Sequence, residues 1–186
     1  SNQQELNEIQ DIYRDLLAPP QPKIVISGIE NSIIHLLAEK VMEEAYKRIG
    51  YDMRYTPFPA KRSLHTANQG ETDGDVARIK GTEKVFPNLV PVPIPVLHFK
   101  GLAFTISTTR NISKWSDLQG LKIGVVRGVR YATLGTQEYN PFYGDNVTHL
   151  FRLLKDGRID VAISAEREGE TELRIDFRDS GIHPVG

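Results

Sequence analysis

A glycine-containing stretch in the second half of the chain, residues 115–131, most constrains the fold. It reads as a short helical turn, a glycine stop, an apolar strand at residues 122–126 and a loop around Gly128 that opens a helix. Such a loop lies at the carboxyl end of a parallel strand, where open α/β sheets place their ligands. Arg127 and Arg130 flank Gly128, so the stretch predicts a parallel α/β sheet with a site for an anionic small ligand.

Composition narrows the classes of protein that this chain can belong to. Its 186 residues suffice for one large domain or two small ones, and 39% apolar and 25% charged residues are typical of a soluble globular protein. The net charge of −1 gives no attraction for nucleic acid, so no nucleic-acid partner is expected. No apolar run is long enough to span a bilayer. The absence of cysteine excludes disulfides, thiolate metal sites and cysteine nucleophiles.

The N-terminal region, residues 1–22, is predicted to be an amphipathic helix over residues 2–17 followed by a proline-rich linker. We expect the apolar stripe of this helix to dock on the body of the protein or on a second copy of the chain.

Residues 23–96 carry two strand–helix steps, the pattern of a parallel sheet. Asn31 or Ser32 is expected to cap the first helix and Gly50 to end it. The expected buried face of that helix comprises Ile34, Leu37, Ala38, Val41, Ala45 and Ile49. The expected elements of this region are strands at residues 23–27, 51–55 and 74–79 and helices at residues 33–49 and 60–68.

A proline-rich segment, residues 90–96, cannot form a central strand and reads as a connector between two lobes. After it, the expected strands are residues 102–106, 122–126 and 159–164, and the expected helices are residues 129–139, 147–156 and 165–175, the last interrupted by Gly169. The second half therefore echoes the first, with a strand, a glycine, a helix and a later glycine-led strand in the same order. The alternatives are two similar lobes, residues 23–96 and 97–186, or chance similarity.

Three short motifs together resemble type II periplasmic solute-binding proteins. Residues 116–128 resemble the start of the second lobe in that class, and residues 74–79 and 157–163 match its two strand-entry patterns. The nearest group is bacterial extracellular solute-binding family 3, which includes amino-acid receptors of ABC importers. The resemblance covers about residues 23–186 and implies a two-lobe α/β fold, with parallel-sheet lobes joined at the proline-rich crossing.

The chain departs from this family in two places. Relatives hold the α-carboxylate of the ligand with an arginine in a Thr-x-x-Arg-like pattern, whereas the nearest match here is Thr82–Lys84, which is one residue short and has lysine. Arg78 is the candidate in its place, because a guanidinium donates two parallel hydrogen bonds. Relatives also return to the first lobe after the second. We expect that return to be absent or truncated here, leaving the N-terminal helix or a swapped copy to cover the first lobe.

The strand-end loops carry eight candidate ligand-binding residues. Arg78 lies at the end of a predicted buried strand, where ligand contact and a structural ion pair are alternatives. Arg127, Gly128 and Arg130 adjoin a helix N-terminus that favours anions, and Tyr131 could form an apolar or cation–π wall. For the other three candidates, helix capping or exposure to solvent is the alternative to ligand contact: Glu30, Asn31 and Glu166.

No sequence motif indicates a metal site, a cofactor site or a catalytic site. The five histidines lack metal-ligand spacing, and Walker, dinucleotide-binding and Gly-x-Ser-x-Gly motifs are missing. We expect no metal, cofactor or catalytic residue, and a binding protein rather than an enzyme.

The resemblance implies a protein exported to the bacterial periplasm, with a signal peptide on its precursor. It would capture a small anionic or zwitterionic, amino-acid-like solute for an ABC-type importer, with a membrane permease as partner. The alternatives are the ligand-sensing domain of a membrane receptor, a carboxylic-acid dehydratase-like enzyme on the same fold, and an interaction module without a ligand. A homodimer through the N-terminal helix or a swapped segment is a further expectation.

Overall fold

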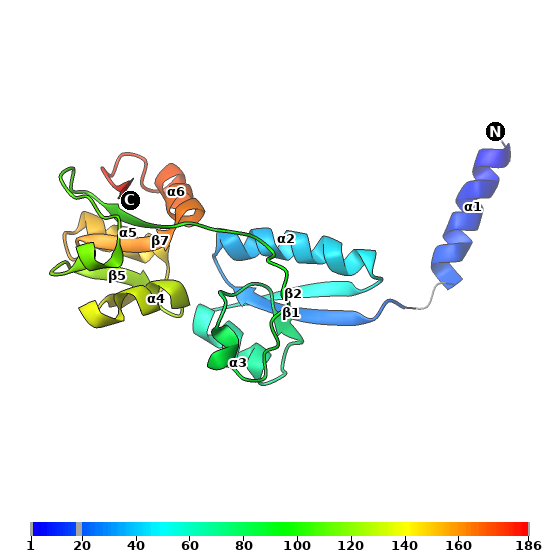
Figure 1. Cartoon of the computed structure of the whole chain (residues 1–186). Helices are drawn as coiled ribbons and strands as arrows, with labels where there is room; N and C mark the ends of the chain where they lie inside the picture. The colour runs from blue at the N-terminus through cyan, green and yellow to red at the C-terminus, as the bar shows by residue number, and fades with distance from the viewer. Residues whose placement is uncertain (1, 18–19, 186) are drawn as a thin grey trace.

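The computed structural model describes residues 2–17 and 20–185 and contains two lobes and a separate N-terminal helix (Figure 1). Helix α1 spans Asn2–Leu17, as its periodicity predicts, and stands apart from both lobes in Figure 1. Ala18 and Pro19 of the expected linker lie outside the described residues. Within the described part of the chain, no helix has the length and apolar character needed to cross a bilayer.

The first lobe is a three-stranded parallel sheet in the order β2-β1-β3. Its central strand is β-branched and apolar, which suits a strand covered on both faces. Figure 1 shows α2 and α3 on opposite sides of this sheet. The elements are β1 (Lys23–Ile29), α2 (Ile33–Arg48), β2 (Asp52–Phe58), α3 (Ala60–Asn68), β3 (Gly74–Asp75) and a 3₁₀ turn at Thr82–Lys84.

The second lobe is a five-stranded sheet in the order β6-β5-β7-β4-β8. Strands β6, β5 and β7 run parallel, whereas β4 is antiparallel to both β7 and β8, so this sheet is mixed. Phe104 and Phe151 are fully buried at its centre. The strands are β4 (Gly101–Thr105), β5 (Ile123–Val126), β6 (Phe142–Gly144), β7 (Val161–Ala165) and β8 (His183–Val185). The helices are α4 (Arg130–Thr136), α5 (Val147–Lys155) and α6 (Glu166–Ile175), with 3₁₀ turns at Trp115–Leu118 and Gln137–Tyr139.

The proline-rich segment contains no strand, and the chain crosses along it from the first lobe to the second (Figure 1). Val90, Val92 and Ile94 are exposed, with Val90 at 88%, whereas Val96 is half-buried against the core of the first lobe. The two sheets fall within the predicted lobes, while the lobe boundaries at residues 22 and 96 stay predictions.

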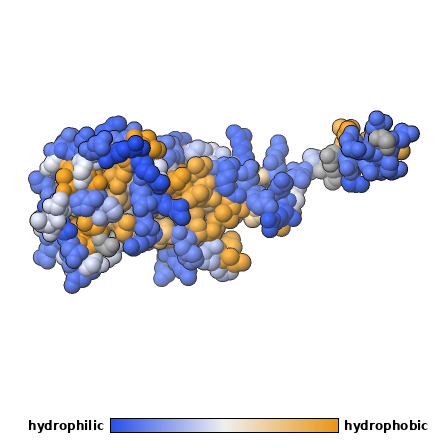
Figure 2. Space-filling model, turned by 90° about the horizontal axis from the view of Figure 1, so that it is seen from above, coloured by the Kyte–Doolittle hydropathy of each residue, from blue (hydrophilic) through white to orange (hydrophobic). Residues whose placement is uncertain are grey.

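The buried face of α2 differs from the expected one. Leu37 and Val41 are 40% and 50% exposed, whereas Ala38 is fully buried and His35 is 6% exposed. The helix carries two apolar stripes, and the stripe that packs on the sheet includes the polar His35, which hydrophobic periodicity does not select. Figure 2 shows the resulting apolar surface over the middle of the molecule.

Four strand or helix predictions also differ from the structure. Strand β3 ends at Asp75 instead of residue 79, β2 continues to Phe58 through an expected loop, and β6 forms in another expected loop. Helix α6 is continuous across Gly169, which was expected to interrupt it. A Cβ at Gly169 would collide with the ring of Phe104, so this glycine allows the helix to pack closely on the core.

Candidate functional site

The loops at the carboxyl ends of the parallel strands meet between the two lobes. In the first lobe, α2 and α3 begin directly after β1 and β2. In the second lobe, α4 and α6 begin directly after β5 and β7. The N-terminal ends of α2 and α3 therefore face the loops that open α4 and α6, the arrangement in which α/β proteins bind ligands.

One contact between the lobes is at Gly128. This residue has a φ of +85° and lies against the start of α3, where a Cβ would be 2.7 Å from the backbone nitrogen of Lys61. It would also be 2.9 Å from the Cβ of Ala60. Both the conformation and the space thus require glycine for this close approach.

A second contact joins α6 of the second lobe to the N-terminus of α2 in the first. The carboxylate of Glu168 accepts a hydrogen bond from the hydroxyl of Ser32. Ser32 is also the N-cap of α2, accepting from the backbone N–H of His35 at 3.3 Å. Burial raises the pKa of Glu168, and the hydrogen bond from Ser32 opposes that shift.

Aromatic side chains adjoin this contact. The ring of Tyr131 packs on that of Phe99 with centroids 5.0 Å apart. The Tyr131 hydroxyl is buried and has no hydrogen-bond partner among the described residues. Burial, and secondarily the charge of Glu168, raises its pKa. A phenol in this state is a donor available to a bound molecule.

Arg78 forms a buried ion pair within the first lobe. Its Nε and Nη2 atoms donate to the two oxygens of Asp75, each at 2.9 Å, and its side chain is 13% exposed. Nη2 also donates to the carbonyl of Ala60 at 3.3 Å, and Ser63 Oγ donates to Asp75 at 2.5 Å. Arg78 thus lies directly behind the part of α3 that contacts Gly128. A ligand contact for it stays a prediction.

His35 lies buried beside this ion pair. Its Nδ1 atom accepts from the backbone N–H of Ile29 at 3.0 Å. Burial, followed by the charge of Arg78, lowers its pKa to about 4, with Asp75 opposing. The imidazole is therefore neutral at pH 7 and serves as a hydrogen-bond acceptor.

The two arginines beside Gly128 have different surroundings. Arg127 is exposed and turns toward its own lobe, with Nη2 3.4 Å from the carbonyl of Tyr143 and the guanidinium 5.7 Å from that ring. Arg130 is half-buried at the first residue of α4 and forms no ion pair among residues 2–17 and 20–185. Arg127 also forms no ion pair among these residues, but its guanidinium lies against Tyr143, whereas that of Arg130 has no such contact in the described part of the chain.

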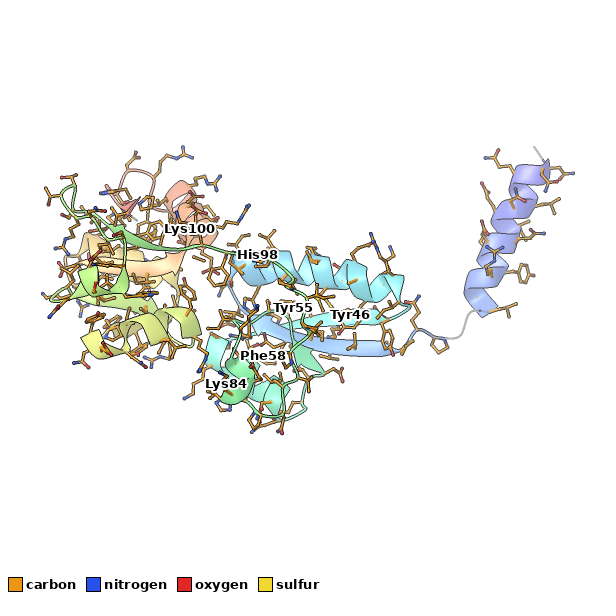
Figure 3. The ribbon with its side chains drawn as sticks, in the orientation of Figure 1. Tyr46, Tyr55, Phe58, Lys84, His98 and Lys100 are labelled. Carbon is orange, nitrogen blue, oxygen red and sulfur yellow. The ribbon has the colours of Figure 1, made fainter. Side chains whose placement is uncertain are left out.

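The acidic and amide candidates line two separate hollows. Glu30 and Asn31 line one of about 290 Å³ at the end of β1. Glu166 lines another of about 360 Å³ with residues of the interlobe crossing. Figure 3 shows two of these, His98 and Lys100, between the lobes. Ser32 lines the first hollow, and α6, which carries Glu168, begins at the second.

Of the residues that join the lobes, sequence reasoning singled out Gly128 but not Ser32 or Glu168. Ser32 was considered only as a helix cap, and Glu168 lies in a charged segment that resembles an ordinary solvated helix start. The sequence signal for Glu168 is its place as an acidic residue in the first turn of a helix that follows a buried strand. No cluster of three or more His, Asp or Glu side chains within the described part of the chain could hold a metal ion.

Sequence comparison gives one partial match. No family model matches the chain. An uncharacterized protein of Shewanella oneidensis is 28% identical over 136 residues, which cover 69% of this chain and 51% of that protein. The chain therefore spans about half the length of this curated relative.

Comparison with solved structures is decisive for the fold. An ancestral arginine-binding protein bound to glutamine superposes with a TM-score of 0.72 at 16% identity, covering 90% of this chain and 80% of that one. A histidine kinase sensor domain with similarity to periplasmic binding proteins gives 0.73 at 18% identity, covering 89% and 77%. This chain has the two-lobe periplasmic-binding-protein-like fold. The expected fold class is confirmed.

A third neighbour has the same architecture. The arginine-bound substrate-binding protein AbpA of an amino-acid ABC transporter from Streptococcus pneumoniae gives a TM-score of 0.68 at 14% identity, covering 88% of this chain and 74% of that one. Proteins named as binding proteins and a protein named as a sensor domain thus share this fold.

Proposed function

We propose that the chain is an extracytoplasmic binding protein that captures a small anionic or zwitterionic, amino-acid-like solute between its lobes for an ABC-type importer. The observation that carries this proposal is the meeting of the strand-end loops of both lobes at Gly128 and Glu168. Binding energy that favours the closed arrangement is sufficient for such a function, and no chemical step is required. Named neighbours that bind amino acids support it.

The proposed ligand contacts are of two kinds: groups that bind the solute carboxylate, and groups that surround the solute. Arg130 and the amides after Gly128 would hold a solute carboxylate, because this guanidinium has no ion pair among the described residues. Tyr131 would donate its unpartnered hydroxyl and provide a wall. The remaining predicted residues would act around the solute or behind it: Glu30, Asn31, Glu166, Arg127 and Arg78.

A thermal-shift screen of amino acids, polyamines and organic acids tests this proposal. A true ligand at 100 times its Kd adds about 2.7 kcal/mol to the free energy of unfolding and raises the melting temperature. Arg130→Ala should lose the shift for carboxylate-bearing ligands, while the exposed Arg152→Ala on α5 should keep it. A panel in which no compound shifts the wild-type midpoint contradicts the proposal.

A ligand-sensing domain of a membrane receptor is the second candidate. The specific support is the likeness to the histidine kinase sensor domain. The gene and its neighbours distinguish the two candidate functions. A membrane-spanning helix and a kinase module on the same polypeptide favour the receptor, whereas a separate neighbouring permease gene favours the importer.

Location and partners belong to the same proposal. A periplasmic protein with this fold would present its closed face to a permease. The apolar stripe of α1, exposed in a single copy, supports pairing with a second copy of the chain.

A further inference from the structure

The hydrogen bond between Ser32 and Glu168 forms a polar connection between the lobes that uses no solute. The carboxylate comes from α6 in the second lobe, and the donor, Ser32, is the N-cap of α2 in the first. Among the side-chain hydrogen bonds of residues 2–17 and 20–185, only that between Ser32 and Glu168 joins the two lobes. The other contact, at Gly128, is a close van der Waals approach.

We propose that Glu168 is a latch that holds the two lobes closed on each other in the absence of any solute. The half-buried carboxylate accepts from the capping hydroxyl of a 16-residue helix and lies at the positive end of the helix dipole. Opening the lobes requires this bond to be broken and removes the carboxylate from the helix N-terminus. The latch therefore biases the ligand-free protein toward the closed arrangement.

The latch lowers the apparent affinity of the proposed binding site for its solute, and this consequence rests on the proposed function. A solute must enter between the lobes, so it binds only the fraction of molecules in which the bond between Ser32 and Glu168 is open. The apparent Kd is the intrinsic Kd divided by that open fraction. A chain with nine-tenths of its molecules latched would bind about tenfold more weakly than an unlatched one.

The test measures the distance between the lobes without a solute. The chain contains no cysteine, so Lys47→Cys on α2 and Lys155→Cys on α5 give two unique spin-label positions. Both lysines are exposed; Lys47 lies near the C-terminal end of α2, and Lys155 lies on α5, which carries no latch residue. Double electron–electron resonance then reports the distribution of distances between the lobes.

Two variants open the latch by different means. Glu168→Ala removes the carboxylate. Ser32→Asp keeps an N-cap acceptor for α2 but removes the hydroxyl donor and sets a like charge against Glu168. Glu170→Ala, an exposed residue on the same helix, is the matched control. Circular dichroism checks that each variant is folded, and Ser32→Asp decides the matter if Glu168→Ala does not fold.

We expect the short-distance population to dominate in the parent and in Glu170→Ala, and a longer-distance population to dominate in both latch variants. Unchanged distributions in the latch variants, or equal opening in Glu170→Ala, overturn the latch. Since no solute is added, a panel of solutes that all fail to bind would refute the proposed function and leave this result standing.

Discussion

Asp75 and Arg78 form a buried ion pair, with side-chain exposures of 3% and 13%, at the strand ends of the first lobe. Asp75→Asn removes the charge that neutralises the guanidinium while keeping the shape of the side chain. We expect the free energy of unfolding to fall by about 3 kcal/mol, because an uncompensated buried charge remains. Urea unfolding followed by circular dichroism measures this loss.

The ion pair between Arg48 and Glu44 provides the comparison, since both side chains are mostly exposed. Arg48→Ala should leave the urea midpoint unchanged within error. Equal effects of Arg48→Ala and Asp75→Asn would show that burial of the Asp75–Arg78 pair does not matter for stability.

His35 predicts how stability changes with pH. Its folded-state pKa of about 4 lies below the unfolded value of 6.5, so the unfolded chain binds more protons between these pH values. This contribution is fully present above about pH 6.5 and is lost as the pH falls toward 4, by on the order of 3 kcal/mol. His35→Gln can still accept from Ile29 but does not titrate. Its stability curve over this window should be flatter than that of the wild type, whereas parallel curves would contradict the assignment.

Sequence alone placed Arg78 at a strand end but left open whether it meets a ligand or an ion-pair partner. The choice depends on which carboxylate the fold brings within hydrogen-bond distance. Asp75 is only three residues away, yet its burial and its bond from Ser63 appear only once β1, β3 and α3 are packed together. The same limit hid Glu168 and Ser32, which are 136 residues apart.

At the scale of elements, Gly169 gives a prediction that opposes helix propensity. Glycine to alanine inside a helix normally stabilises by about 1 kcal/mol. In α6 the added methyl would collide with Phe104, which is fully buried, and overpacking costs about 1–3 kcal/mol. We therefore expect Gly169→Ala to lower the thermal unfolding midpoint. The exposed neighbour Glu170→Ala should not lower it, and a raised midpoint for Gly169→Ala would show that the contact with Phe104 is absent.

The sequence predicts which segments form helices and strands better than it predicts which face of a helix is buried. Strong periodicity located α1, α2 and α5 and the parallel strands β1, β5 and β7. The buried face of α2 could not be chosen, because the stripe that packs includes His35, whose polarity is satisfied by the backbone of Ile29. Strand β6 was missed because it is three residues long and is defined by pairing with β5.

At the scale of the whole molecule, α1 predicts self-association. Leu6, Ile9, Tyr13 and Leu16 are spaced by three and four residues and are 48–75% exposed in one copy. We expect sedimentation equilibrium to show a dimer whose dissociation constant increases at least tenfold in Ile9→Glu. The exposed neighbour Gln10→Glu should leave it unchanged. A wild-type chain that stays monomeric at every concentration would contradict the dimer.

The two-lobe arrangement was predictable from the order of motifs because each parallel strand followed by a helix is a local pattern. The antiparallel pair β4 and β8 was not, since a three-residue edge strand containing Pro184 carries no periodic signal. The lobes touch at Gly128 and at Glu168. The strand–glycine–helix pattern indicated Gly128, but its contact with α3 and the bond of Glu168 to Ser32 join distant parts of the chain that no local pattern encodes.

Isothermal titration calorimetry of the full chain with individual amino acids tests the central claim, that the facing strand-end loops hold a small solute, most directly. The account predicts saturable binding of at least one of them, with one solute per chain and weakening of at least tenfold in Arg130→Ala. Absence of saturable heat for every amino acid at millimolar concentration, or equal binding by Arg130→Ala, would contradict it.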